Sequence, residues 1–75
     1  MRIENYSIDI KRHALLRALK RGIDPDVLET VIRSGRIEKF RKNYARFIKD
    51  YKNCKIICIG QIQPTRIKIL TITRK

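Results

Sequence analysis

The chain has 75 residues and a mass of 8.9 kDa, enough for one small domain over residues 1–75. Its 19 Lys and Arg outnumber its 7 Asp and Glu, so the formal net charge is +12 and a polyanionic partner is expected. No apolar run approaches the roughly 20 residues of a membrane span, which argues against a membrane protein and predicts a cytoplasmic one. A hydrophobic content of 43% indicates a folded chain rather than a disordered one.

The first part of the chain is expected to be an extended lead followed by a helix. The lead covers residues 1–8, and its three apolar anchors are Ile3, Tyr6 and Ile8. The helix is predicted from about Asp9 or Ile10 to Arg21, with Asp9 as N-cap and Gly22 as the stop. Its predicted packing stripe has four residues at helical spacing: Leu15, Leu16, Ala18 and Leu19.

A second helix is marked at both ends. Asp24 is a good N-cap, Pro25 fits the first helical position, and Gly35 ends the pattern. The apolar stripe between these ends consists of Val27, Leu28, Val31 and Ile32. Because the connection between the helices is very short, an αα-hairpin is expected.

The C-terminal half predicts strands. Four segments are rich in Ile, Thr and aromatic residues: 37–40, 44–48, 55–61 and 66–73. Short turns at 42–43, 52–53 and 63–65 separate them, so each strand should be antiparallel to the next. Leu70 and Ile72 break the alternation of the last strand, which indicates either a bulge or burial on both sides near its end. The expected fold is α+β, with two N-terminal helices packed on one face of a four-stranded antiparallel meander sheet.

The two cysteines predict neither a disulfide nor a metal site. Cys54 and Cys58 lie four residues apart, too far for a bridge along one strand, and the chain has a single histidine. No acidic cluster lies in the basic regions, and no glycine-rich phosphate loop is present. We therefore expect free thiols, no metal and no organic cofactor.

The charges are distributed unevenly. Asp24, Asp26 and Glu29 lie together at the start of the second helix, and no acid follows Asp50. The first helix and the sheet should therefore be basic, as in nucleic-acid-binding proteins. The candidate contacts to nucleic acid are Lys20, Tyr44, Arg46, Lys49, Arg66 and Lys68. Alternatives remain open for the charge, which is either only a solvated face or part of a basic helix at a membrane surface. The interleaved aromatics Tyr44, Phe47 and Tyr51 either stack on bases or fill the core.

One row on the first helix combines a histidine with two arginines. At 100° per residue His13, Arg17 and Arg21 fall on one side of the helix, opposite Leu15 and Leu19, and so face solvent or a groove. An imidazole can accept a proton near neutral pH, and a guanidinium can hold a phosphate through two hydrogen bonds. The row suits RNA cleavage by the 2′-hydroxyl, with His13 as base and either arginine at the phosphorus, and it suits passive phosphate binding equally well.

The same residues resemble a family of small prokaryotic domains of unknown function related to the RelE/ParE-like and BrnT-like toxins. The resemblance covers about residues 10–73 and rests on His13-Ala14, Arg17, Arg21-Gly22-Ile23, Gly35 and Ile69-Leu70-Thr71-Ile72. It implies a RelE-like fold, an mRNA endonuclease or gyrase poison, and control by an antitoxin. It also implies that Arg46, Arg66 and Lys68 stand where such nucleases place cations on the sheet. No tyrosine follows Tyr51, so the late tyrosine of those nucleases has no counterpart here.

Together these observations predict a toxin-like protein that acts on RNA, as a metal-independent endoribonuclease with His13, Arg17 and Arg21 as catalytic residues. Two other classes stay open. One is a non-catalytic module that binds RNA or DNA, and the other is a structural protein whose basic face meets an acidic partner such as an antitoxin. The Ile-rich edge strands also leave a homodimer open.

Overall fold

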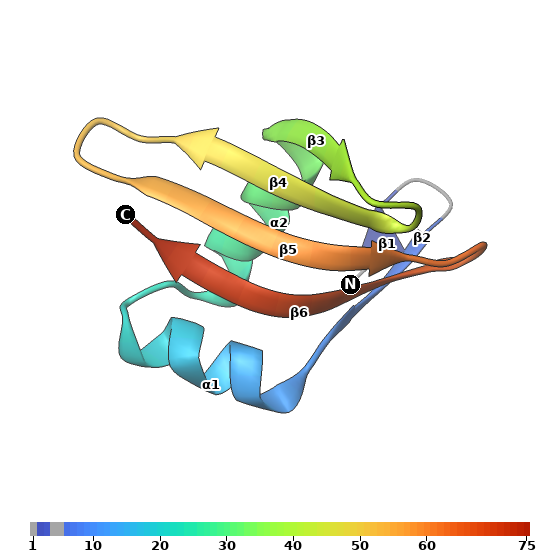
Figure 1. Ribbon diagram of the computed structural model, residues 1–75. Coiled ribbons are helices and arrows are strands. Elements are labelled where there is room, and N and C mark those ends of the chain that lie inside the picture. The colour runs from blue at the N-terminus through green and yellow to red at the C-terminus, as the bar shows by residue number, and fades with distance from the viewer. Residues whose placement is uncertain (1, 4–5) are drawn as a thin grey trace.

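The computed structural model describes residues 2–3 and 6–75, with side chains from residue 6 onward (Figure 1). The elements, in chain order, are β1 (Arg2–Ile3), β2 (Tyr6–Ile10), α1 (Arg12–Lys20), α2 (Pro25–Ser34), β3 (Arg36–Phe40), β4 (Tyr44–Asp50), β5 (Lys55–Ile62) and β6 (Arg66–Arg74). The strands form one sheet in the order β1-β2-β6-β5-β4-β3. Both helices lie on the same face of this sheet, where they share one hydrophobic core with it.

The predicted four-stranded antiparallel meander is wrong. β3, β4, β5 and β6 are antiparallel neighbours, but β2 pairs parallel to β6, with Ile8 opposite Ile67 and Ile10 opposite Ile69. The sheet is therefore mixed, with five strands of five or more residues, and the two-residue β1 extends it beyond β2. A parallel pair requires a crossover, and here both helices and three strands separate its two partners along the chain.

Helix α1 begins later than predicted because the residues before it form the strand that pairs with β6. Asp9 and Ile10 belong to β2, so the helix starts at Arg12, and Lys11 occupies the N-cap without a side-chain hydrogen bond. The prediction that Asp9 caps this helix is wrong. Gly22 follows the helix with φ 77°, the left-handed conformation expected of a helix stop.

The two helices pack in different ways. α1 contacts β6 through two small residues, Ala14 and Ala18, which are fully buried. Half of the predicted stripe is confirmed, because Ala18 is buried and Leu15 packs against the core. The other half is wrong, because Leu16 and Leu19 are 50% and 48% exposed. Small residues let the helix backbone approach the strand closely, and larger side chains would hold it away.

Helix α2 agrees with its prediction. The carboxylate of Asp24 accepts a hydrogen bond from the backbone N–H of Val27 at 3.0 Å, and Pro25 is the first helical residue. Gly35 ends the helix where the chain turns into β3. A Cβ there would lie 2.7 Å from the carbonyl oxygen of Ile48, so this close passage requires glycine.

The core lies between the helices and the covered face of the sheet. Its largest fully buried residues are Ile23, Leu28, Val31, Cys58 and Ile69. Tyr6 and Ile8 contact this core as expected of anchors, whereas the side chain of Ile3 lies outside the described residues. The register of β5 and β6 shifts between Ile59 and Gly60, which is the bulge expected near Leu70. In the part of the chain that the structure describes, neither helix is long and apolar enough to cross a membrane.

Candidate nucleic-acid interface

The predicted row of His13, Arg17 and Arg21 faces β6. These three side chains line a hollow of about 120 Å³ together with Ala14 and residues 70–73 of β6. All three residues are exposed, although they border the helix face that packs on the sheet. The row therefore forms one wall of a narrow groove between α1 and β6, which we call the α1–β6 groove.

Arg21 is held in place by hydrogen bonds on both sides. Its Nη1 donates to the carbonyl oxygen of Ile72 at 3.2 Å, and Arg74 Nη1 donates to the carbonyl oxygen of Arg21, also at 3.2 Å. These contacts fasten the C-terminal end of α1 to β6. Among the described residues His13 and Arg17 make no side-chain hydrogen bond or ion pair with protein, so both remain available to a ligand.

The cations of α1 have no acidic neighbours on their own helix. Lys11, Arg12, Arg17, Lys20 and Arg21 are all exposed, and we call them the α1 cations. The first turn contains no acid, and the ion pairs found within residues 6–75 involve none of the five. No ion pair among the described residues therefore neutralises any of the α1 cations.

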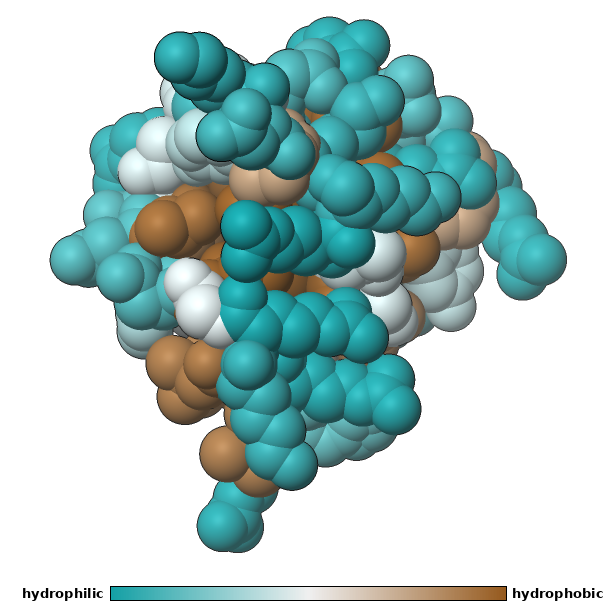
Figure 2. Space-filling model, turned by 90° about the vertical axis from the view of Figure 1, so that its left-hand side faces the viewer, coloured by the Kyte–Doolittle hydropathy of each residue, from teal (hydrophilic) through white to brown (hydrophobic). Residues whose placement is uncertain are grey.

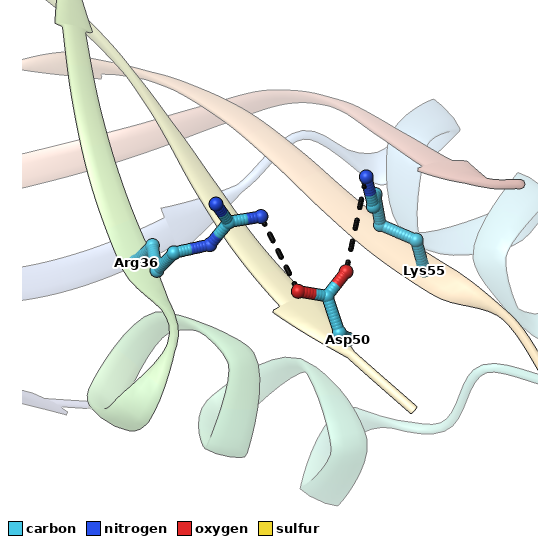
Figure 3. Close-up of polar contacts among 3 residues, drawn as sticks. All are labelled: Arg36, Asp50 and Lys55. Atoms are coloured by element: carbon cyan, nitrogen blue, oxygen red, sulfur yellow. Dashed lines mark hydrogen bonds and ion pairs between the residues drawn. The ribbon is translucent and has the colours of Figure 1, made fainter. Parts of the chain in front are cut away.

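The sheet face turned away from the helices is different, although it also carries five cations. The alternation of the strands places on this open face Arg36, Arg46, Lys55, Arg66 and Lys68, together with Asp9, Glu38 and Asp50. Asp50 lies 3.3 Å from Arg36 and 3.8 Å from Lys55 (Figure 3). Glu38 and Asp9 lie 3.9 Å from Arg46 and Arg66, respectively. Every acid of this face is thus paired, and the face is much less basic than the sequence suggests.

The predicted nucleic-acid contacts therefore fall in three places. Lys20 lies on α1, whereas Tyr44, Arg46, Arg66 and Lys68 lie on the open face. Lys49 is opposite Ile56, on the side of the sheet that the helices cover.

The aromatic residues also lie in different parts of the structure. The Tyr44 and Phe40 rings lie 5.8 Å apart, and the guanidinium of Arg46 lies 4.5 Å above Phe40. Phe47 is buried in the core, as one of the two alternatives predicted, while Tyr51 is 38% exposed. Tyr51 lies apart from the open-face cluster, in a hollow that it shares with Lys52 and Arg74. Sequence reasoning missed this hollow, because it forms only when the turn after β4 meets the end of β6.

The two thiols are free, as predicted. Burial raises the pKa of the Cys58 thiol to about 12, so this thiol stays protonated and inert at neutral pH. Cys54 is half-buried at the edge of the core. Within the described residues no three His, Cys, Asp or Glu side chains gather as metal ligands would.

Comparisons of the chain with known proteins identify no relative. No family model, no curated protein and no solved structure matches the chain. The relation to RelE/ParE-like and BrnT-like toxins therefore stays a prediction that rests on the residues named above.

Proposed function

We propose that the protein binds RNA through the α1 cations and the α1–β6 groove. The observation that supports this most directly is the contrast in charge pairing. Five cations lie on or beside α1 with no acid among them, whereas the acids of the open face are all ion-paired. A one-sided basic surface attracts a phosphate backbone, and the counterions that it releases stabilise the complex.

RNA is preferred to DNA because of the resemblance to mRNA-directed toxins. The same surface would also accept an acidic antitoxin, which would then compete with RNA for the α1 cations. Both partners are consistent with the cytoplasmic location that the sequence predicts.

The salt dependence of binding tests this proposal. A short fluorescently labelled single-stranded RNA is titrated with the protein over a series of salt concentrations. Each phosphate contact on a single strand contributes about 0.7 to the slope of log K against log salt, so several contacts give a slope of several units. An affinity independent of salt would rule out a phosphate-binding surface, and the absence of binding at low salt would rule out the function.

Endoribonuclease activity is a second candidate, and one observation favours it: His13 and Arg17 line the same hollow. In such a reaction His13 would take the proton of a 2′-hydroxyl while that oxygen attacks the adjacent phosphorus. The 5′-oxygen would leave with a proton taken from solvent water, to which His13 later returns the proton of the 2′-hydroxyl, and Arg17 would stabilise the charge on the phosphoryl oxygens. The products would be a 2′,3′-cyclic phosphate and a 5′-hydroxyl.

Cleavage and binding are separated by comparing His13→Ala with the wild type. If the protein is a nuclease, the variant retains RNA affinity but loses cleavage by at least about 100-fold, the contribution typical of a general base. The measurement uses purified protein with RNA alone and with ribosomes, and it identifies the product ends. Wild-type protein that leaves RNA intact in both settings would restrict the function to binding.

A further inference from the structure

A larger hollow, of about 410 Å³, opens at the end of the molecule where the α1–α2 connection, the β4–β5 turn and the end of β6 meet. Figure 2 faces this end, where long hydrophilic side chains lie beside apolar residues. The hollow, called here the end hollow, is lined by Gly22, Ile23, Val27, Tyr51, Lys52, Asn53, Cys54, Ile56 and Arg74. Its volume falls in the range of about 300–1,000 Å³ that is usual for small-ligand sites.

The end hollow has an apolar floor and an aromatic wall. Ile23 and Ile56 are buried beneath it, and Val27 is half-buried at its side. Tyr51 is 38% exposed, so part of its ring remains free for contact. The backbone N–H of Tyr51 donates to the carbonyl oxygen of Cys54 at 2.7 Å, which closes the turn and holds the backbone that carries the ring. Such a surface suits a flat, apolar ring.

The rim of the end hollow is positive. Lys52 and Arg74 are exposed lining residues, and none of the nine lining residues is acidic. Asp24, which follows the lining residue Ile23, directs its carboxylate to the N-terminus of α2, where it accepts from Val27. An anionic group would therefore be held at the side formed by Lys52 and Arg74.

The end hollow is also connected to the α1–β6 groove. Arg74 lines the hollow and donates to the carbonyl oxygen of Arg21, which lines the groove. The backbones of Lys55 and Lys75 exchange two hydrogen bonds of 2.8 Å, which hold the chain just beyond Arg74 against β5. A ligand that spans both features would meet Lys52, Arg74, Arg21 and Arg17 in succession.

We propose that the end hollow binds one unstacked base of a single-stranded RNA, with the flanking phosphates on Lys52 and Arg74. The base stacks on Tyr51, and the Asn53 amide can donate to or accept from its polar edge. The strand then continues along Arg21 and Arg17. This inference rests on the proposed RNA-binding function and adds to it a preference for an unpaired base over bare phosphate.

The test compares two aromatic residues and two polyanions. Affinities for a short single-stranded RNA and for inorganic polyphosphate are measured with wild type, Tyr51→Ala and the control Phe40→Ala from the open face. Base–aromatic stacking predicts that Tyr51→Ala weakens RNA binding by about 5-fold to 150-fold. We expect this variant to bind polyphosphate like the wild type, and Phe40→Ala to bind both ligands like the wild type.

A second measurement needs no variant and so does not depend on whether Tyr51→Ala folds. The RNA carries one 2-aminopurine, whose fluorescence reports on stacking, and it is mixed with wild-type protein. Fluorescence quenched further on binding, with single-stranded RNA preferred to a duplex of the same sequence, supports the proposal. Unquenched fluorescence, or equal loss of RNA affinity in Tyr51→Ala and Phe40→Ala, overturns it while RNA binding itself stands. Wild-type protein that binds neither RNA nor polyphosphate overturns the proposed function as well.

Discussion

Helix α1 with its two flanking residues and the open face of the sheet each present five cations, yet only on the open face are cations paired with acids. On the open face three acids lie among the cations, and each acid forms at least one ion pair. On α1 no acid lies among them. A count of Lys and Arg therefore does not identify a binding surface; what matters is whether the fold brings acids to the same place.

The difference arises from strand pairing. Asp9 precedes α1 in the chain and would be close to its cations in an extended helix. Because Asp9 belongs to β2, its carboxylate lies beside Arg66 on the open face instead. Asp50 likewise bridges Arg36 and Lys55, which come from different strands. The sheet thus holds three of the acids on its open face, and Asp24, Asp26 and Glu29 lie at the start of α2. None of the ion pairs within residues 6–75 involves an α1 cation.

The largest expected effect comes from removing two cations from each surface in turn. Arg17→Gln with Lys20→Gln should lower the affinity for single-stranded RNA by roughly 100-fold, since a hydrogen bond to a charged group contributes about 1.5–3 kcal/mol and each 1.4 kcal/mol is tenfold. Arg46→Gln with Lys68→Gln changes the net charge equally and should lower it by less than about 3-fold. Fluorescence anisotropy at one fixed salt concentration measures both. Equal losses would show that net charge alone sets the affinity.

The covered and open faces should also differ in their tolerance of added volume. Ala18 is fully buried against β6, so Ala18→Leu should push α1 from the sheet and reduce the free energy of unfolding by about 1–3 kcal/mol. Ser7→Leu adds a similar volume at an exposed position of the open face and should change stability by less than about 0.5 kcal/mol. Urea denaturation followed by circular dichroism measures both. A stable Ala18→Leu protein would mean that α1 is free to move away from β6.

The parts of the fold that the sequence predicts well are those set by neighbouring residues. Asp24, Pro25 and Gly35 mark the ends of α2 because capping and close backbone passage are decided within a few residues. The pairing of β2 with β6 depends instead on residues nearly 60 positions apart, and no turn signals it. A local clue was present all the same: Tyr6, Ile8 and Ile10 alternate with Ser7 and Asp9, which is a strand pattern.

The candidate site was predictable in the same uneven way. The helical spacing of His13, Arg17 and Arg21 suffices to place them in one row, and they line one hollow. The prediction for the packing face of α1 placed Ala18 correctly but included Leu16 and Leu19 and missed Ala14. Leucine is usually buried, whereas the close contact with β6 is made here by two alanines. The end hollow brings together three distant segments of the chain, so only the tertiary structure reveals it.

The two cysteines, one in the core and one at its edge, should contribute differently to the pH dependence of stability. The pKa of Cys58 rises from 9.0 to about 12 on burial, so the folded state keeps its proton while the unfolded state loses it. This contribution to stability is complete below pH 9 and should fall between pH 9 and 12, by about 1.4 kcal/mol at about pH 10. Urea denaturation at several pH values should therefore show a steeper decline for wild type than for Cys58→Ala. Cys54→Ala retains Cys58 and should decline like wild type; equal slopes for all three proteins would contradict the burial of this thiol.

The smallest expected effect comes from unmasking cations on the open face. Asp50→Asn removes the charge that Arg36 and Lys55 share, and because all three side chains are about half exposed, the loss of stability should stay below about 1 kcal/mol. The two freed cations should then attract RNA and raise its affinity by about twofold to threefold at low salt, a gain that higher salt screens. The matched control is Asp26→Asn on α2, which changes the net charge equally but frees no cation of the open face. If both variants gain affinity to the same extent, freeing cations on the open face does not improve RNA binding there. The higher RNA affinity expected of α1 would then come from the shape of the α1–β6 groove and not from its unpaired charge.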